Sequence, residues 1–314
     1  MDQKAQDTKK RYSIYPLHHP ELFDMYKKHR ANNWTEAEID FRNDNFEALN
    51  DGHKRMVKKL IFFFANSDAI VADNIFTNLL SGDIPLEAEL FFGYQLHNEF
   101  IHMITYGDLI EAYIKNVDEK HEAYEAIYQS DFVAKKLQWA DNYATEANSF
   151  AESLVAAIAV ESIYFSSTFA TIFWLKELNL PLSGLFKANL SILKDEIDHY
   201  MFTTHLFKNY LTEEIDDIKV KSILLDAVDV EKQFIDDCIG EGVDGVKGEE
   251  LKKYVEFVCD IVLQAMGYEK HFGTEHNLRF MDGIGIQKTV NFFEKRSSNY
   301  IKAEGSVDIN LEDF

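Results

Sequence analysis

Two short segments of the sequence each carry a glutamate followed three residues later by a histidine: Glu99 with His102, and Glu196 with His199. On an α-helix, residues at this spacing project from the same face, about one turn apart. A carboxylate and an imidazole placed in this way can bind one metal ion together. The repeated pair therefore predicts a site for two metal ions, provided that both segments are helical and face each other.

One further acidic residue precedes each pair within an apolar segment: Asp68 before the first and Glu161 before the second. An unpaired charge there is costly, which argues that both carboxylates coordinate a cation. Four carboxylates balance two divalent ions, and oxygen-rich ligation with one imidazole per metal suits iron or manganese better than structural zinc. One Glu-x-x-His pair alone is common on helices without metal. The repeated order of all six residues is what predicts the dinuclear carboxylate site of ferritin-like bundles.

Tyr106 lies about two helical turns beyond the first glutamate and therefore faces the same way. Its phenol is expected beside the metal nearest Asp68, although a tyrosine in a bundle core is usually a packing residue. Three apolar residues at helical spacing from the predicted ligands are expected to line the same neighbourhood: Phe165, Phe169 and Ile192. They are either ordinary core residues or a dry wall around an oxidisable phenol.

Long helices must position these residues, and the sequence favours them. Only four prolines interrupt the chain, and no alternating strand pattern of useful length occurs. Helices are expected near residues 20–34, 52–80, 85–114, 150–177, 185–210, 213–240 and 247–270, with one more within 115–149. The segment 150–175 is apolar nearly all round, but its two glutamates make it a poor membrane span and favour the centre of a bundle. The predicted fold is an all-α, ferritin-like bundle.

Composition narrows the possible partners. The protein has 314 residues and a net charge of −22, so its surface repels phosphate backbones, and neither nucleic acid nor a membrane is an expected partner. Cys238 and Cys259 form no Cys-x-x-Cys pair and are expected to be free thiols in a reducing compartment, the cytoplasm. The polar N-terminus lacks the apolar core of a signal peptide. The histidines outside the two pairs, such as His97 and His205, are expected to be ordinary surface or core residues.

Taken together, the motifs resemble the small, radical-generating subunit of class I ribonucleotide reductase, particularly its eukaryotic and viral type. The resemblance runs along nearly the whole sequence, through RYSIYPLHHPELFDMYKK, NNWTEAEID, FFFANSDAIVADN, NEFIHMITYGDLIEAYIK, VESIYFSSTFATIFWLK, LKDEIDHY, NFFEKRSSNY and the terminal DF. Departures are small. Lys194 stands where relatives commonly have arginine, which leaves the chemistry untouched. The tail after Tyr300 is short, which could alter its docking reach.

The resemblance implies a cofactor of two iron ions per protomer and a stable tyrosyl radical on Tyr106, shielded by Phe165, Phe169 and Ile192. Manganese in one or both positions stays open, because the ligand sets of the two metals overlap. The implied ligands are Asp68, Glu99 and His102 for one ion, and Glu161, Glu196 and His199 for the other. Trp34 and Asp195 match the start of the radical-transfer route, with Asp195 holding both the Trp34 indole and the His102 imidazole. The sequence alone would favour a helix-packing role for Trp34.

The resemblance also implies how the protein is organised. Residues 1–295 would form the di-iron domain of a homodimer. Residues 296–314 would form a mobile tail in which Tyr300 relays the radical and the terminal NLEDF docks into a separate large subunit. That subunit would reduce ribonucleoside diphosphates, because the present sequence has no nucleotide-binding glycine motif and no group of redox cysteines.

Two other functions compete with this interpretation. A di-iron oxidase that hydroxylates or desaturates a small substrate would need an open channel to the metals, and it would not explain Tyr106 together with Trp34, Asp195 and Tyr300. An iron-storage protein would need neither a radical tyrosine nor an aromatic docking tail.

Overall fold

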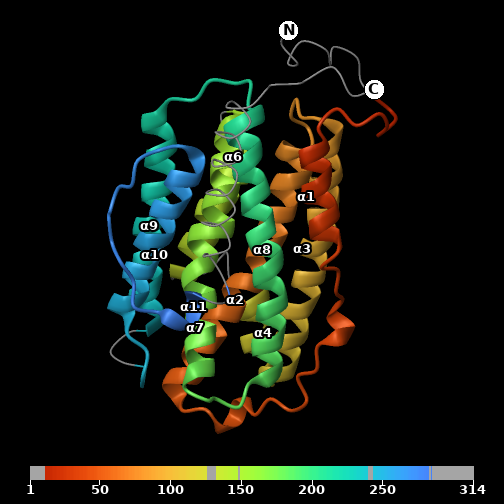
Figure 1. Ribbon diagram of the computed structural model, residues 1–314. Helices are drawn as coiled ribbons and strands as arrows, with labels where there is room; N and C mark the ends of the chain where they lie inside the picture. The colour runs from red at the N-terminus through yellow and green to blue at the C-terminus, as the bar shows by residue number, and fades with distance from the viewer. Residues whose placement is uncertain (1–10, 126–131, 148, 240–242, 283, 285–314) are drawn as a thin grey trace, which may run out of the picture.

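The structure is a computed structural model that describes residues 11–125, 132–147, 149–239, 243–282 and 284, and within these ranges it contains helices and no strands (Figure 1). The helices are α1 (Pro20–Arg30), α2 (Asp51–Asn74), α3 (Leu86–Tyr113), α4 (Val117–Tyr124), α5 (Phe132–Glu146), α6 (Phe150–Ile158), α7 (Phe165–Glu177), α8 (Ser183–Tyr210), α9 (Asp217–Ile239), α10 (Gly248–Met266) and α11 (Arg279–Asp282). Short 3-10 turns cover Glu36–Glu38 and Phe46–Ala48. The predicted all-α, ferritin-like bundle is confirmed.

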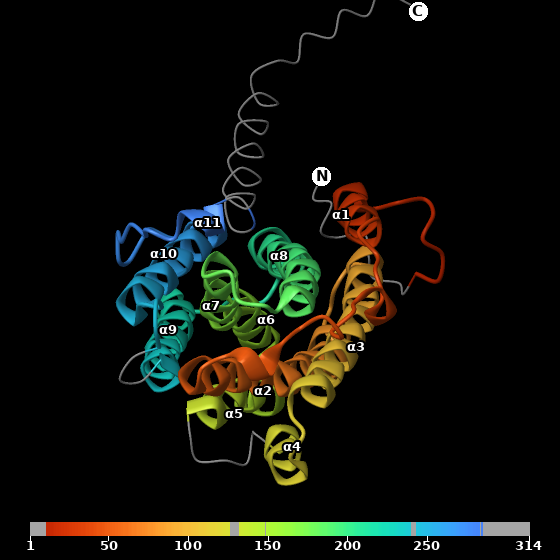
Figure 2. The same ribbon diagram turned by 90° about the horizontal axis from the view of Figure 1, so that it is seen from below.

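The long helices run side by side and enclose the centre of the molecule. Seen from below, α2, α3, α6 with α7, and α8 surround this centre (Figure 2). Helices α9 and α10 lie outside them on one side, and α1 lies on the other side beside α3. The four surrounding elements are those that carry the predicted metal ligands, so the bundle brings these residues together.

The segment predicted as one helix over 150–177 is interrupted. A π-helical segment, Ala159–Tyr164, separates α6 from α7, and a second one, Ile75–Leu79, ends α2. A π-bulge inserts a residue into the turn and is frequent at functional sites, because it redirects the side chains that follow. Glu161 lies within the first of these segments, and this local change of helical register was not predicted.

The start of α8 is held by an acidic side chain from a distant loop. The carboxylate of Asp44 accepts hydrogen bonds from the backbone N–H groups of Gly184 at 2.7 Å and Leu185 at 3.0 Å, which satisfies donors that a helix start leaves unpaired. The loop approaches so closely that a Cβ on Gly184 would lie 2.6 Å from the backbone oxygen of Asp40. This contact fixes the position of α8, which carries one of the Glu-x-x-His pairs.

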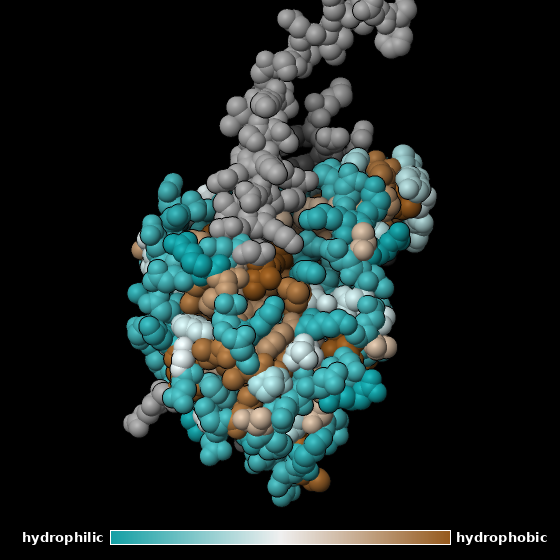
Figure 3. Space-filling view, turned by 60° about the horizontal axis from the view of Figure 1, so that its bottom comes forward, coloured by the Kyte–Doolittle hydropathy of each residue, from teal (hydrophilic) through white to brown (hydrophobic). Residues whose placement is uncertain are grey.

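Two helical stretches are long and apolar enough to span a membrane by length and composition, Asp51–Leu79 and Phe150–Glu177. Their most apolar windows are 61% and 100% buried inside the bundle, as expected of core helices. Hydrophilic residues cover most of the face shown in Figure 3, with hydrophobic residues gathered near its centre.

Candidate metal centre

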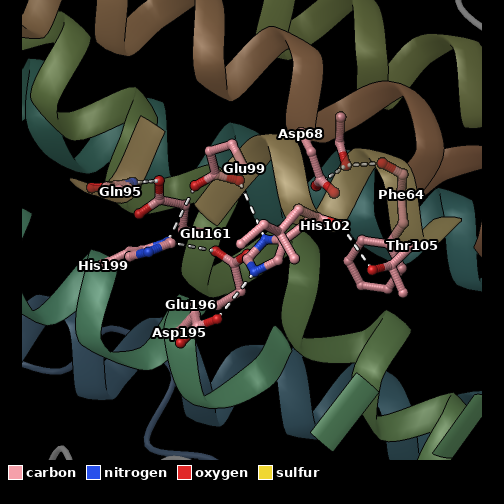
Figure 4. A network of polar contacts seen from close by, with 12 residues as sticks. Phe64, Asp68, Gln95, Glu99, His102, Thr105, Glu161, Asp195, Glu196 and His199 are labelled. Carbon is pink, nitrogen blue, oxygen red and sulfur yellow. Dashed lines mark hydrogen bonds and ion pairs between the residues drawn. The ribbon is translucent and has the colours of Figure 1, made fainter. Parts of the chain in front are cut away.

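Six side chains with metal-binding groups converge between the four central elements (Figure 4). All are at most 3% exposed. They are Asp68 from α2, Glu99 and His102 from α3, Glu161 from the π-helical segment, and Glu196 and His199 from α8. The structure therefore brings together all six residues whose convergence was predicted from spacing and charge.

Two glutamates lie between the two histidines. Nδ1 of His102 is 3.0 Å from Glu196 Oε1 and 3.5 Å from Glu99 Oε2. Nδ1 of His199 is 3.2 Å from Glu99 Oε1 and 3.3 Å from Glu196 Oε2. Because each glutamate contacts both imidazoles, Glu99 and Glu196 occupy the place of bridging carboxylates, and Nδ1 is the histidine atom that faces the centre.

The remaining acids lie at opposite ends of this arrangement, Asp68 on the side of His102 and Glu161 on the side of His199 (Figure 4). One oxygen of each is held by a neighbour: the Ser67 hydroxyl donates to Asp68 Oδ1 at 3.2 Å, and Gln95 Nε2 donates to Glu161 Oε1 at 2.6 Å. These hydrogen bonds orient the carboxylates and leave their second oxygens available.

Burial and charge compete at every group in the cluster. Burial raises the pKa of Asp68 and Glu161 well above the usual range. Burial acts in the same direction on Glu99, but hydrogen bonds with His102 and His199 lower its pKa to about 2. Burial would lower the pKa of both histidines, yet the surrounding carboxylates raise it well above the usual value. The centre therefore favours the binding of positive charge.

The donor atoms fit a pair of divalent metal ions. Glu99, Glu161, Glu196 and His199 offer ligand atoms that lie within 4.8 Å of one another. Within the described residues, Asp68 Oδ2 and Glu161 Oε2 have no hydrogen-bond partner, while the oxygens of Glu99 and Glu196 crowd around the two Nδ1 atoms. Buried polar atoms are rarely left without a partner, and a coordinated cation would satisfy all of these at once.

Tyr106 is fully buried next to this cluster. Burial, followed by the negative charges of Asp68 and Glu196, raises its pKa well above the usual value, so the phenol keeps its proton. The hydroxyl donates to Asn189 Oδ1 at 2.8 Å, an acceptor that was not predicted from the sequence. The ring stacks on Phe64, with centroids 4.8 Å apart and planes within 12° of each other.

Two of the three predicted apolar residues pack near Tyr106 through a further ring, that of Phe64. Phe165, Phe169 and Ile192 are all buried. The ring of Phe64, which stacks on Tyr106, also packs against Phe165 at 5.2 Å and Phe169 at 4.9 Å between centroids. Phe64 thus links the tyrosine to the two predicted phenylalanines. It lies four residues before Asp68, and this helical spacing could have identified it from the sequence.

Asp195 contacts both residues that the family resemblance assigned to it. Its Oδ2 accepts from Trp34 Nε1 at 2.7 Å and lies 3.2 Å from His102 Nε2. The Trp34 indole lies nearly parallel to the His102 ring, with centroids 6.0 Å apart. A continuous series of polar contacts therefore joins the centre to Trp34, which lies in the loop after α1 and is 8% exposed.

The expectation for the remaining histidines was wrong at one position. His29, on α1, is 1% exposed, and its Nε2 lies 3.1 Å from Nε2 of His199. The signal was present in the sequence, since Leu22, Met25, Tyr26 and His29 form the inward stripe of an amphipathic helix. Gln95 and Asn189 were missed in the same way, although each lies on the ligand face of its own helix.

A small cavity reaches the centre between the π-helical segment, α8 and α10. It holds about 20 Å³ and is lined by Glu161 and Glu196 together with mainly apolar residues that include Phe169 and Ile197. Pockets that enclose organic ligands of drug size span roughly 300–1,000 Å³. This volume is about that of one water molecule.

Known proteins are similar to this one in both sequence and fold. The family "Ribonucleotide reductase, small chain" matches residues 11–278. A ribonucleoside-diphosphate reductase small chain from Arabidopsis thaliana is 38% identical over 309 residues, which cover 96% of the present sequence and 92% of that protein. The corresponding protein of Yaba-like disease virus is 36% identical over 298 residues, with 94% and 91% covered.

A solved structure agrees with these matches. The ribonucleotide reductase Rnr4 homodimer from Saccharomyces cerevisiae superposes with a TM-score of 0.79 at 27% identity, covering 93% of this protein and 90% of that one. Sequence and fold thus agree along almost the full length. The chain belongs to the ribonucleotide reductase small chain family.

Proposed function

We propose that this small subunit of ribonucleoside-diphosphate reductase holds two iron ions in the carboxylate–histidine centre and produces a tyrosyl radical on Tyr106. The radical then passes to a large subunit that reduces ribonucleotides to deoxyribonucleotides. The observation that carries the proposal is the fully buried phenol of Tyr106 beside six convergent metal-binding side chains. The enzyme class, an oxidoreductase, follows from the family.

The six ligands would form two sets, one for each metal ion. Asp68, Glu99 and His102 would hold one ion, and Glu161, Glu196 and His199 the other, with Glu99 and Glu196 shared. When bound, the reduced metal pair supplies the electrons and the coordination site for activating oxygen. The oxygen-rich donor set also suits manganese, so metal analysis of protein purified from its own host decides between the two metals.

Tyr106 would give one electron to the oxygen-oxidised centre and release its phenolic proton at the same time, because a buried phenol radical cation would be strongly disfavoured. The proton cannot remain on Asn189, since an amide oxygen is a very weak base. The carboxylates of Asp68 and Glu196, whose negative charges act on the phenol, lie on the side to which this proton would leave. Phe64, Phe165 and Phe169 exclude water and reductants from the resulting radical.

The radical would leave through the contacts from His102 to Asp195 and Trp34. The rest of the proposed route, Tyr300 and the docking segment 310–314, lies outside the described residues. We propose that this tail engages the large subunit and that both proteins act in the cytoplasm. The two cysteines, Cys238 and Cys259, are free and buried, which fits a reducing compartment.

A homodimer is the proposed assembly, and α3 offers a surface for it. Phe100 and Ile104 are 49% and 50% exposed on the outer face of this helix. Gly93 and Gly107 lie on the same stripe, and a Cβ added at either position would meet nothing within 4 Å. Glycines beside large apolar residues let a second helix approach closely. The related Rnr4 structure is itself described as a homodimer.

The two competing functions fit less well. A hydroxylase or desaturase must admit its organic substrate to the metals, whereas the cavity at Glu161 and Glu196 holds only about 20 Å³. An iron-storage role leaves the buried contact of Trp34 with Asp195 without a purpose.

The decisive experiment compares the wild type with Tyr106→Phe after ferrous iron and oxygen are added to the metal-free protein. Electron paramagnetic resonance should show an organic radical in the wild type that a radical scavenger quenches. The variant should bind the same two equivalents of iron and show no such signal. Iron uptake by the wild type without any radical would instead favour an oxidase or a storage protein.

A further inference from the structure

The two metal-binding imidazoles have different partners on their outer nitrogens. Nε2 of His102 faces the carboxylate of Asp195 at 3.2 Å, whereas Nε2 of His199 faces another imidazole, that of His29, at 3.1 Å. His29 comes from α1, which packs against both α3 and α8. A carboxylate partner can only accept a hydrogen bond, but an imidazole can accept or donate, so the position of its proton depends on the groups around it.

The surrounding contacts leave one arrangement of protons when the centre is loaded. Nδ1 of His199 faces Glu99 and Glu196, so this nitrogen is the one that binds metal and Nε2 carries the hydrogen. Nε2 of His29 must then accept that hydrogen, which puts the proton of His29 on its Nδ1. That nitrogen points toward Asp198 Oδ2, 3.6 Å away. With hydrogens on Nε2 of His199 and Nδ1 of His29, each N–H thus faces an acceptor, His29 Nε2 in the first case and Asp198 in the second.

The packing around His29 holds its ring in this orientation. The ring stacks on Phe91 at 5.1 Å between centroids and meets the ring of Tyr94 edge to face at the same distance. Asp198 is in turn contacted by Lys28 Nζ at 3.4 Å and Asn32 Nδ2 at 3.3 Å, both from the region where α1 ends. His29 is thus packed by aromatic rings, meets His199 through Nε2, and faces the carboxylate of Asp198 with Nδ1 across 3.6 Å.

We propose that His29, held by its packing on Phe91 and Tyr94, is a positioning residue that fixes the ring orientation and tautomer of His199 as a metal ligand. This inference rests on the proposed function of the centre. A carboxylate that accepts the Nε2 hydrogen makes an imidazole a stronger metal ligand than a neutral imidazole in the same place does. The ion at His199 is therefore held more weakly than the ion at His102. The two positions should therefore fill in order, with the His102 position first.

The test is a titration of the metal-free, full-length protein with Mn²⁺, in which free Mn²⁺ is counted by its electron paramagnetic resonance signal. The wild type should bind two equivalents in two steps. His29→Ala should weaken the second step by about 10–100-fold and leave the first unchanged. His29→Gln, whose amide oxygen can accept from His199, should recover most of the loss. The matched control is His121→Ala, at a histidine whose side chain is 73% exposed on α4.

The possible results separate the role of His29 from the existence of the centre. Unchanged Mn²⁺ binding by His29→Ala would overturn the role of His29 while leaving the centre intact. Equal weakening of both steps, or no recovery in His29→Gln, would also overturn it, because either result indicates a general effect on the fold. A wild-type protein that binds no pair of ions would contradict the proposed centre itself.

Discussion

At the scale of single residues, the environment of Tyr106 is set by one hydrogen bond as well as by apolar packing. Its hydroxyl donates to Asn189 Oδ1 at 2.8 Å, and the amide nitrogen of Asn189 donates to the backbone oxygen of Leu185 at 2.8 Å. The second contact prevents the amide from turning over freely. After oxidation the phenoxyl oxygen would lack a hydrogen and would face the amide oxygen, so this contact stabilises the phenol more than the radical.

Replacing Asn189 with leucine should therefore make the radical longer-lived. A buried phenol without an acceptor is destabilised by roughly 1–3 kcal/mol, which lowers the driving force for reducing the radical back to tyrosine. The measurement is the decay rate of the radical signal in the presence of a scavenger, at equal metal loading. A radical that decays as fast as in the wild type, or faster, would show that the hydrogen bond does not control its stability.

At the scale of secondary-structure elements, the outer face of α3 is expected to form the dimer contact. Phe100→Glu combined with Ile104→Glu would place two charges in an apolar interface, which should cost about 3 kcal/mol or more. Light scattering after gel filtration should show a monomer. The control is Ile218→Glu, an exposed apolar position on α9, which should remain dimeric. A dimer that survives both α3 substitutions would place the interface elsewhere.

A buried ion pair connects α5 to α9 on the other side of the bundle. Lys136 Nζ lies 2.8 Å from Glu231 Oε2, and both residues are fully buried. The ammonium group also donates to the backbone oxygen of Tyr164, the last residue of the π-helical segment, at 3.1 Å. It lies 3.6 Å from the centroid of the Phe63 ring. The pair therefore supports the segment that carries Glu161.

Removing one partner of this pair should destabilise the protein more than removing both. Lys136→Met leaves Glu231 buried without a partner and should cost about 3–5 kcal/mol, while Lys136→Met with Glu231→Leu should be neutral or stabilising by about 1–4 kcal/mol. Urea denaturation of the two variants measures the difference. Equal stability of the single and double variants would argue against a coupled pair.

The same pair predicts a dependence on pH. Burial lowers the pKa of Lys136 from 10.5 to about 8. Between these values the unfolded protein holds a proton that the folded protein has released, so the free energy of unfolding rises with pH across this window and falls again as pH drops toward 8. The rise is on the order of 3 kcal/mol relative to the double variant. A flat difference between pH 8 and 10.5 would contradict the lowered pKa.

At the scale of the whole molecule, we propose that residues 1–295 generate the radical and that residues 296–314 deliver it to the large subunit. A protein that ends at residue 295 should keep metal binding and the radical signal, because every proposed ligand and the apolar wall lie before that point. It should lose ribonucleotide reduction with the large subunit entirely. Tyr300→Phe in the full-length protein should give the same loss while still binding the large subunit. Reduction that persists in either variant would contradict the proposed role of the tail.

Local patterns alone predicted much of the fold and the centre. Helical spacing placed each glutamate beside its histidine, and the cost of a buried charge singled out Asp68 and Glu161. The same patterns predicted the long helices, with errors mainly at their ends. The first helix stops at Arg30, before the predicted residue 34, and the helix predicted from residue 213 begins at Asp217. Helix ends depend on how the backbone turns toward its neighbours, which periodicity does not encode.

Only the tertiary structure decided which groups meet across helices. The partners of the phenol, of Glu161 and of His199 are Asn189, Gln95 and His29, and each comes from a different helix of the bundle. The π-helical turn at Glu161 likewise packs against α8 and α9. Spacing within one helix determines which side chains share its face, whereas the docking of one helix against another determines what that face touches. The sequence by itself therefore predicted which residues converge, and the packing of the bundle determined their hydrogen bonds.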